Sequence, residues 1–448
     1  MKVYIVYEVF NREYDNCLLL KSALEKNNYI VEIVYKMSLL SIKPSDEKTI
    51  IFIPNCYDDN NFQFYYYLCG HKNAVLINMQ YEQVLSDDPE NIDAHTPKGR
   101  AANIYNLCWG KGFETFLDSV GIKPSLSFVG GALHLDFLRD GFYSFWKSRE
   151  DLASEFSLPT DKKWVLFISS FAYANNELVN RASDRVYGKD NNLAFRKLSN
   201  DSREAILNWF DEYLSKNVEK VIIYRKHPME KYDNRLLSMA SKYKNRFYLI
   251  SDYNIKQWIY VSDDILNWFS TSAVECVAAQ KSFEILRPIP VEAGTEVVLF
   301  KNARFIETFR KFDEYMKSEG RPQGYPFDVS LIKDMYEINN EPSFDKIINR
   351  LKTIEKENDF LNYVDPDYAK NRKRFIKNSH LLLKYRIKRT YQWFFLNLHI
   401  RLNALGLRKK YDIEDWEFQA KIKDDISKIN AINKIVDDYY ETKRSKNV

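Results

Sequence analysis

The sequence contains few cysteines for its length. Five occur among 448 residues, and no two of them form a Cys-x-x-Cys pair. A disulfide framework needs an even set of paired cysteines, and zinc clusters commonly use Cys-x-x-Cys ligands. The cysteine pattern therefore argues against both and fits a protein of a reducing compartment.

Long apolar runs and glycine-rich phosphate loops are also missing. No stretch of about 18 apolar residues occurs, so we predict no membrane-spanning helix. The opening residues MKVYIV are interrupted at Glu8 and are too short for a signal peptide. Neither Gly-x-Gly-x-x-Gly nor the P-loop pattern is present, which disfavours NAD-binding and P-loop NTPase functions. We therefore expect a cytoplasmic protein.

Positive and negative charges nearly balance, but they are unevenly distributed. The 66 Lys and Arg residues against 62 Asp and Glu give a net charge of +4. Residues 369–411 hold 13 basic residues and no acidic one, which leaves the rest of the chain at −9. With 45% hydrophobic residues the chain can bury ordinary cores. At roughly 100–200 residues per domain, its length predicts two domains plus an extension.

Short apolar runs alternate with helix-like stretches in two series. The first has strand patterns at residues 3–6, 29–35, 49–54, 73–78 and 125–129, and a helix at 15–27. The second has strand patterns at 164–168, 220–224, 247–250, 264–267 and 283–286, and helices at 201–217, 234–243, 255–261 and 273–279. Such alternation is typical of parallel sheets. We predict an α/β protein with two Rossmann-like domains facing a cleft, at 1–145 and 146–330, and a helical extension at 331–448.

The second series carries polar residues after two of its strands. His227-Pro228 follows one strand, and Ser270-Thr271-Ser272 follows another and opens a helix that contains Glu275. Hydroxyls at a helix start suit a phosphate, the histidine could donate to that phosphate or protonate it as it leaves, and the glutamate could bind ribose hydroxyls. The alternative is an N-cap beside an ordinary loop histidine. The pairing of both motifs in one domain favours a phosphate site.

Charged residues also follow the first strand. Glu8, Arg12, Glu13 and Asp15 lie in the loop and at the start of the next helix. A carboxylate there could act as a general base or stabilise a cationic sugar transition state. The alternative is that these carboxylates only complement the helix N-terminus.

Several segments, in order along the chain, resemble the bacterial surface carbohydrate biosynthesis proteins. They are YEVFNREYDNCLLL at 7–20, VGGALHLD at 129–136, FISSFAYAN at 167–175, RKHP at 225–228 and STSAVE at 270–275. The second segment keeps only the Gly and Asp of the family pattern Gly-Asn-Pro-Arg-Phe-Asp, and it departs at Gly131 and Ala132. The resemblance covers about residues 3–290.

The resemblance implies a glycosyltransferase of the GT-B type, similar to bacterial Kdo and sialic acid transferases and to CDP-glycerol glycerophosphotransferases. It implies a metal-independent enzyme without cofactor, whose second domain binds the donor. Glu13 becomes the favoured catalytic carboxylate with Glu8 in reserve, and His227 is the second catalytic candidate. The implied donor-binding residues are Arg225, His227, Pro228, Ser270, Thr271, Ser272, Glu275 and Ser169. Arg12 and Asp136 are further cleft candidates.

The basic segment 369–411 intersperses its cations with aromatic and aliphatic residues. That composition is typical of a helix lying on an anionic membrane surface. The alternative is that the aromatics pack on the catalytic domains. No nucleic-acid recognition module accompanies the segment, so we expect no nucleic-acid partner.

These observations predict a glycosyltransferase of capsule, O-antigen or related glycan synthesis, on the inner face of the plasma membrane. Its expected partners are a nucleotide sugar, such as a CMP-linked ulosonic acid, and a glycan or lipid-linked acceptor. Two alternatives remain open. One is a CDP-alditol phosphotransferase, and the other is a non-catalytic protein of glycan assembly.

Overall fold

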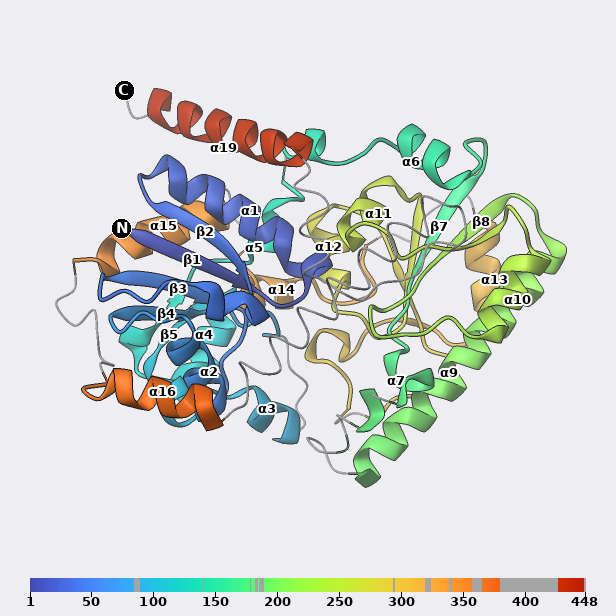
Figure 1. The fold of residues 1–448 in the computed structure, drawn as a ribbon. Helices are drawn as coiled ribbons and strands as arrows, with labels where there is room; N and C mark the ends of the chain where they lie inside the picture. The colour runs from blue at the N-terminus through green and yellow to red at the C-terminus, as the bar shows by residue number, and fades with distance from the viewer. Residues whose placement is uncertain are drawn as a thin grey trace, which may run out of the picture. The chain divides into compact units, whose positions relative to one another are not determined.

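The chain forms two compact units. The computed structural model describes residues 1–83, 89–139, 141–177, 179–181, 184, 189–292, 295–318, 324–337, 341–356, 365–378 and 426–446. Unit 1 consists of Met1–Tyr81, Thr96–His134 and Asn339–Val448, and unit 2 of Glu82–His95 and Leu135–Ile338. Each unit is built around one parallel sheet of six strands (Figure 1).

The sheet of unit 1 has the strand order β2-β1-β3-β4-β5-β6, and all its neighbours are parallel. Strands that are covered by helices on both faces read as continuous apolar runs, and β3 and β4 are buried along their whole length. The strands are β1 Lys2–Tyr7, β2 Ile30–Tyr35, β3 Thr49–Ile53, β4 Ala74–Asn78, β5 Tyr105–Cys108 and β6 Ser127–Val129.

Helices from both ends of the chain cover this sheet. They are α1 Phe10–Lys26, α2 Asp59–Leu68, α4 Lys111–Ser119, α15 Ser343–Ile354, α16 Tyr368–Asn378 and α19 Ile426–Lys446, with short 3₁₀ turns η1 Lys36–Ser41, η2 Gly99–Asn103 and η3 Pro124–Leu126. The C-terminal α19 packs along α1, and α16 packs against α2 (Figure 1).

Polar contacts hold the C-terminal helices in place. The Lys428 ammonium lies 2.7 Å from the Asp15 carboxylate of α1. The Tyr368 hydroxyl donates to the carbonyl of Tyr66 in α2 at 3.0 Å. The C-terminal helices α15, α16 and α19 therefore belong to the fold of unit 1.

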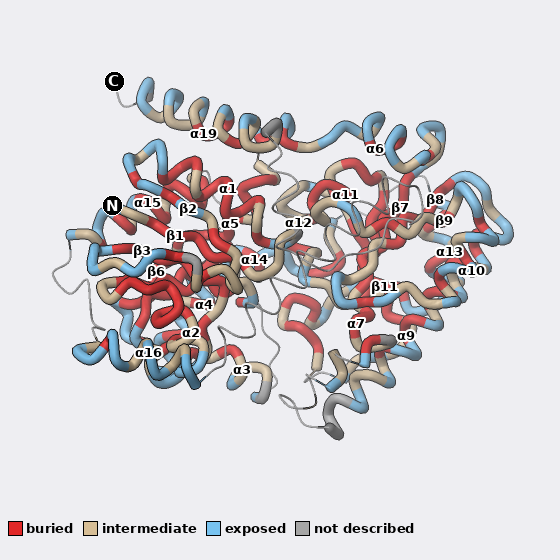
Figure 2. The backbone as a smooth tube through the Cα atoms, viewed as in Figure 1, coloured by how far each residue is buried: buried red, intermediate tan, exposed pale blue. Residues whose placement is uncertain are grey.

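The sheet of unit 2 has the order β12-β11-β10-β7-β8-β9, again with parallel neighbours only. If the six strands are numbered 1–6 along the chain and read from β9 to β12, this is the Rossmann order 3-2-1-4-5-6. Its interior strands β7 and β8 are almost entirely buried (Figure 2). The strands are β7 Lys163–Ile168, β8 Lys220–Arg225, β9 Phe247–Leu249, β10 Asp264–Asn267, β11 Glu284–Leu286 and β12 Phe305–Ile306.

Aromatic side chains dominate the core of unit 2. Phe167, Phe210, Tyr224, Trp268 and Phe312 belong to one buried cluster. The helices of unit 2 are α3 Pro89–His95, α6 Arg149–Phe156, α7 Ala172–Asn175, α9 Lys189–Lys216, α10 Asn234–Lys242, α11 Ile255–Val261, α12 Ala273–Ala278, α13 Phe309–Lys317 and α14 Ser330–Met335, with 3₁₀ turns η4 Tyr143–Phe145 and η5 Val298–Phe300. The short α5 Leu133–Asp136 lies where the chain passes from unit 1 to unit 2.

The sequence-based prediction of two Rossmann-like parallel-sheet domains with a helical C-terminal region is confirmed. Within the described ranges, no helix combines the length and apolarity needed to cross a membrane. Most of the basic segment 369–411, on which we base the membrane prediction, lies outside the described residues. Only its first ten residues are described, and they belong to α16.

Candidate functional site

Each sheet has one position where the chain reverses its direction of strand addition. In unit 1 this position lies between β1 and β3, and in unit 2 between β7 and β10. Connections on the two sides of such a point leave toward opposite faces, so a crevice opens at the carboxyl ends of the two strands. Ligands of open α/β sheets bind there. These two points are therefore the places to look for functional side chains.

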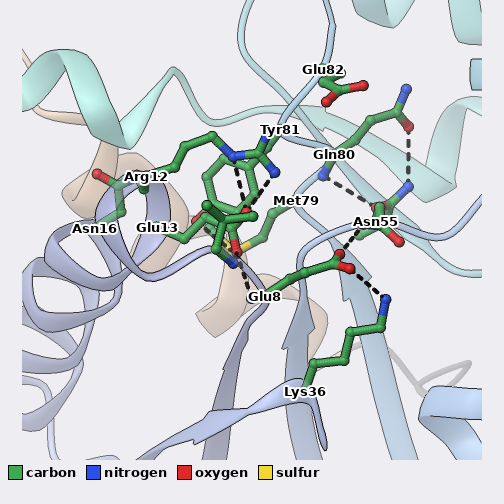
Figure 3. A network of polar contacts seen from close by, with 12 residues as sticks. Glu8, Arg12, Glu13, Asn16, Lys36, Asn55, Met79, Gln80, Tyr81 and Glu82 are labelled. Atoms are coloured by element: carbon green, nitrogen blue, oxygen red, sulfur yellow. Dashed lines mark hydrogen bonds and ion pairs between the residues drawn. The ribbon is translucent and has the colours of Figure 1, made fainter. Parts of the chain in front are cut away.

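Glu8 lies at the switch point of unit 1. It follows β1, and its carboxylate accepts hydrogen bonds from the Lys36 ammonium and the Asn55 amide, both at 2.9 Å (Figure 3). Lys36 follows β2 and Asn55 lies just beyond β3, so three adjacent strand ends contribute to the cluster. The Glu8 side chain is 36% exposed. It can therefore reach a ligand while its charge is balanced by a cation.

Glu13 has different surroundings, although it lies only five residues further along the chain, in the first turn of α1. Its side chain has no solvent exposure. One carboxylate oxygen accepts from the backbone N–H groups of Glu8 and Val9, at 2.7 and 3.2 Å. The other accepts from Nε and Nη2 of Arg12, at 3.1 and 2.6 Å (Figure 3). One oxygen thus holds the loop that carries Glu8, and the other is paired with Arg12.

The remaining charged candidates fall into two groups. Arg12 is half exposed, and its guanidinium lies 5.7 Å from the ring centre of Tyr81. It therefore joins the Glu8 and Glu13 cluster. Asp136 is fully buried in unit 2, where its carboxylate accepts from Nε of Arg139 at 2.8 Å. A buried, paired carboxylate of this kind fits a structural role.

Sequence reasoning missed several polar residues at the same edge of unit 1. Asn78 ends β4 and donates to the side-chain oxygens of Asn106 in β5 and of Gln80, both at 3.1 Å. All three are fully buried. Lys36 and Asn55 were missed as well. The available signal was a polar residue directly at the end of an apolar strand.

In unit 2, the loop after β8 presents His227. Its Nδ1 accepts from the backbone N–H of Met229 at 3.2 Å. A ring nitrogen that accepts carries no proton, so the neutral ring bears its proton on Nε2. The imidazole is partly exposed. This tautomer makes Nε2 a hydrogen-bond donor toward an anionic ligand.

A buried carboxylate fixes the His227 loop. Glu230 is 1% exposed, and it accepts from the backbone N–H of His227 at 3.3 Å and from the Tyr224 hydroxyl at 2.7 Å. It also accepts from the hydroxyl of Ser169, at the end of β7. Ser169, which we expected to bind the donor, is 3% exposed and is engaged in this network. Sequence reasoning did not identify Glu230, because Ser169 and Arg203, two of its partners, are distant along the chain.

Burial governs the electrostatics of this network. Burial raises the pKa of the Glu230 carboxyl, and the hydrogen bonds from Ser169 and Tyr224 and the charge of Arg203 oppose the shift. Arg203 on α9 lies 3.6 Å from Glu230 and 2.7 Å from Asp233, and it is only 4% exposed. The loop that carries His227 is therefore tied to β7, β8 and α9.

The Ser270–Ser272 loop follows β10 at the switch point of unit 2. The Asn267 side chain braces it, because it accepts from the N–H of Ser270 at 2.9 Å and donates to the carbonyl of the same residue at 2.6 Å. The Ser270 hydroxyl in turn accepts from the N–H of Ser272 at 3.2 Å. The Thr271 side chain is exposed. The expected helix begins at Ala273 but has only six residues, and Ser272 makes no side-chain cap.

The other expected donor ligands differ in their accessibility. Pro228 is exposed, and Glu275 is partly buried, which raises the pKa of its carboxyl. The Arg225 guanidinium donates to the backbone carbonyls of Asp252, at 2.8 Å, and of Tyr253. Arg225 therefore braces the loop after β9.

The register of unit 2 places these strand ends level with one another. Ile168 is opposite Arg225 on one side and opposite Asn267 on the other, and Asn267 is opposite Ile285. The residues that follow these four strands therefore share one edge of the sheet. Among the described residues, no three His, Cys, Asp or Glu side chains are grouped so that they could hold a metal ion.

Comparisons with known proteins find similarity in structure alone. The sequence matches no protein-family model, and no curated protein matches it. A UDP co-structure of MnaA from S. aureus shares 15% identity at a TM-score of 0.45, covering 79% of this chain and 97% of that one.

Two further solved structures are similar. The UDP-GlcNAc 2-epimerase of Methanocaldococcus jannaschii shares 14% identity at a TM-score of 0.49, with 79% and 100% coverage. A variant of the wall teichoic acid polymerase TagF shares 11% identity at 0.46, with 81% and 90% coverage. Because all these values are low, the fold assignment rests on the two sheets described above.

Proposed function

We propose that this chain is a glycosyltransferase of bacterial surface polysaccharide synthesis that uses a nucleotide-activated sugar, such as a CMP-linked ulosonic acid. One observation carries the proposal. Side chains suited to this chemistry follow strands of both sheets: a partly exposed carboxylate at the switch point of unit 1, and in unit 2 an imidazole donor after β8 and a hydroxyl-rich loop after β10. The ordered sequence motifs favour the same function.

Unit 2 binds the donor in this proposal. His227 donates its Nε2 proton to a donor phosphate oxygen, and the hydroxyls of Ser270 and Thr271 donate to the same group. When the bond between the sugar and the phosphate breaks, negative charge grows on the leaving phosphate. A hydrogen-bond donor such as the His227 imidazole, held in place by a buried network, stabilises that charge without reorganisation. Glu230 supplies this positioning, since it fixes the backbone of His227.

Unit 1 activates the acceptor in this proposal. The acceptor hydroxyl attacks the anomeric carbon, its proton passes to a carboxylate, and the nucleotide leaves with the bonding electrons. Glu13 is our sequence-based choice for this base, but a fully buried carboxylate with four donors is poorly placed to receive a proton. We therefore assign the proton transfer to Glu8 and a positioning role to Glu13.

Nucleotide binding by the full-length protein tests the proposal. We expect CMP, CDP, UDP or GDP to raise the melting temperature of the wild type, because a ligand of the native state stabilises it. His227→Ala should abolish this shift. His95→Ala is the matched control, since His95 is a histidine of the same unit that pairs with Glu82. The absence of a shift with every nucleotide would contradict the proposal and favour a non-catalytic assembly protein.

A further inference from the structure

Arg287 is a buried cation at the proposed donor edge of unit 2. It directly follows β11, the strand next to β10. Its guanidinium carbon lies 5.2 Å from the ring centre of Phe269, which immediately precedes Ser270, and 4.8 Å from that of Phe305. The side chain is therefore held against the start of the hydroxyl-rich loop.

The hydrogen-bonding capacity of Arg287 is only partly used. The residue is 3% exposed. Its Nη2 contacts both carboxylate oxygens of Glu296, at 2.9 and 3.1 Å. Among the described residues, Nε and Nη1 have no hydrogen-bond partner. Burial lowers the pKa of the guanidinium to about 10, and Glu296 opposes this shift, so the group is charged at neutral pH.

Buried donors without acceptors are costly, and so is a buried charge that is incompletely paired. At the other end of β11, an arginine shows the usual combination of one carboxylate partner and exposure to solvent. There Glu284 pairs with Arg304 at 2.7 Å, and the Arg304 side chain is 49% exposed, so its remaining donors are accessible to solvent. Arg287 has neither that exposure nor a full set of partners. An anion at this position would complete its hydrogen bonds.

We propose that Arg287 is an anion-binding residue of the donor site, and that it contacts the phosphate of a nucleotide together with the Ser270–Ser272 loop. The inference rests on the proposed function. Four adjacent strand ends would then line the donor edge, from the His227 loop after β8 to Arg287 after β11. They span three strand spacings, or about 14 Å. Glu296 orients the guanidinium and leaves its other donors for the ligand.

The test compares each of CMP, CDP, UDP and GDP with its nucleoside, by titration calorimetry on the full-length protein. Wild type should bind at least one nucleotide more tightly than the matching nucleoside. Arg287→Gln should weaken binding of that nucleotide at least about tenfold, as expected for a lost hydrogen bond to a charged group. Binding of the nucleoside should remain unchanged. Arg304→Gln, just before the neighbouring strand β12, should change neither affinity.

Folding defects are separated by two further variants. Arg287→Lys keeps the charge but not the planar fork, so nucleotide affinity should recover only in part. The double variant Arg287→Gln, Glu296→Gln removes both buried charges, so it should regain thermal stability but not nucleotide affinity. If the double variant binds the nucleotide as tightly as wild type does, Arg287 has only a structural role. If wild type binds no nucleotide, the proposed function fails together with the role of Arg287. If wild type binds a nucleotide and the Arg287 variants bind it equally well, only the role of Arg287 fails.

Discussion

The substitutions Glu13→Gln and Glu8→Gln should have opposite consequences. Glu13 lies fully buried and accepts four hydrogen bonds, two from backbone N–H groups and two from Arg12. A glutamine keeps one oxygen and replaces the other with an NH₂ group. In either orientation, one pair of donors loses its acceptor and faces another donor. The protein therefore loses either the two backbone hydrogen bonds that hold the loop carrying Glu8 or the two hydrogen bonds from Arg12.

The magnitude follows from these contacts. Hydrogen bonds to a charged group contribute about 1.5–3 kcal/mol each, and less where one partner is exposed. Arg12 is 42% exposed. We therefore expect Glu13→Gln to lower the free energy of unfolding by about 2 kcal/mol, which corresponds to a decrease in Tm of about 4–8 °C. For Glu8, whose ion pair is partly exposed, the loss should be less than about 1 kcal/mol.

Differential scanning calorimetry and a donor-consumption assay measure the two effects on the same preparations. Glu8→Gln should retain nearly the wild-type Tm and lose transfer by about 100-fold or more, the usual contribution of a general base. For Glu13→Gln the main effect should be the decrease in Tm. If Glu13→Gln keeps the wild-type Tm and abolishes transfer while Glu8→Gln stays active, Glu13 and not Glu8 is the catalytic carboxylate.

Three other predictions follow from the described contacts and the sequence. Glu230→Gln should weaken nucleotide binding, because Glu230 positions His227. In a double-mutant cycle, the double variant Glu230→Gln, His227→Ala should therefore lose no more nucleotide affinity than His227→Ala alone. Additive losses of affinity would contradict this positioning role. Burial lowers the pKa of His71 from its ordinary value of 6.5, so the unfolded chain binds the proton more readily and stability should fall as the pH drops below about 6.5. Between about pH 7 and pH 5, the free energy of unfolding measured with urea should decrease less for His71→Asn than for wild type. An equal decrease in both proteins would refute the role of His71 in this pH dependence. Neutralising four cations of the basic segment should weaken binding to phosphatidylglycerol vesicles by up to about 1 kcal/mol per cation at low salt; unchanged binding would exclude membrane contact through Lys384, Arg386, Lys388 and Arg389.

Apolar periodicity in the sequence was sufficient to predict most strands. Residues 255–261 and 264–267 were predicted as the helix and strand that the structure contains, α11 and β10. β5 was missed, because its four residues include Asn106 and show no alternation. α1 begins at Phe10, five residues before the predicted start, since Glu13 satisfies backbone groups ahead of the helix.

The candidate site was only partly readable from the sequence. His227 and the Ser270–Ser272 loop were found because a polar motif after an apolar strand is a local signal. Glu230 and Arg287 act through burial and through partners on other strands or loops, which no local pattern records. For the same reason, the sequence could not distinguish the buried Glu13 from the partly exposed Glu8.

Glycosyl transfer is tested most directly by the chemical structure of the product. Wild-type protein is incubated with nucleotide donors that carry an isotopically labelled sugar or alditol and with a bacterial lipid-linked glycan fraction, and the product is analysed by mass spectrometry and NMR. We predict release of the free nucleotide and a new glycosidic bond to the labelled sugar, both absent in His227→Ala. A phosphodiester linkage would contradict glycosyl transfer and identify an alditol phosphotransferase instead.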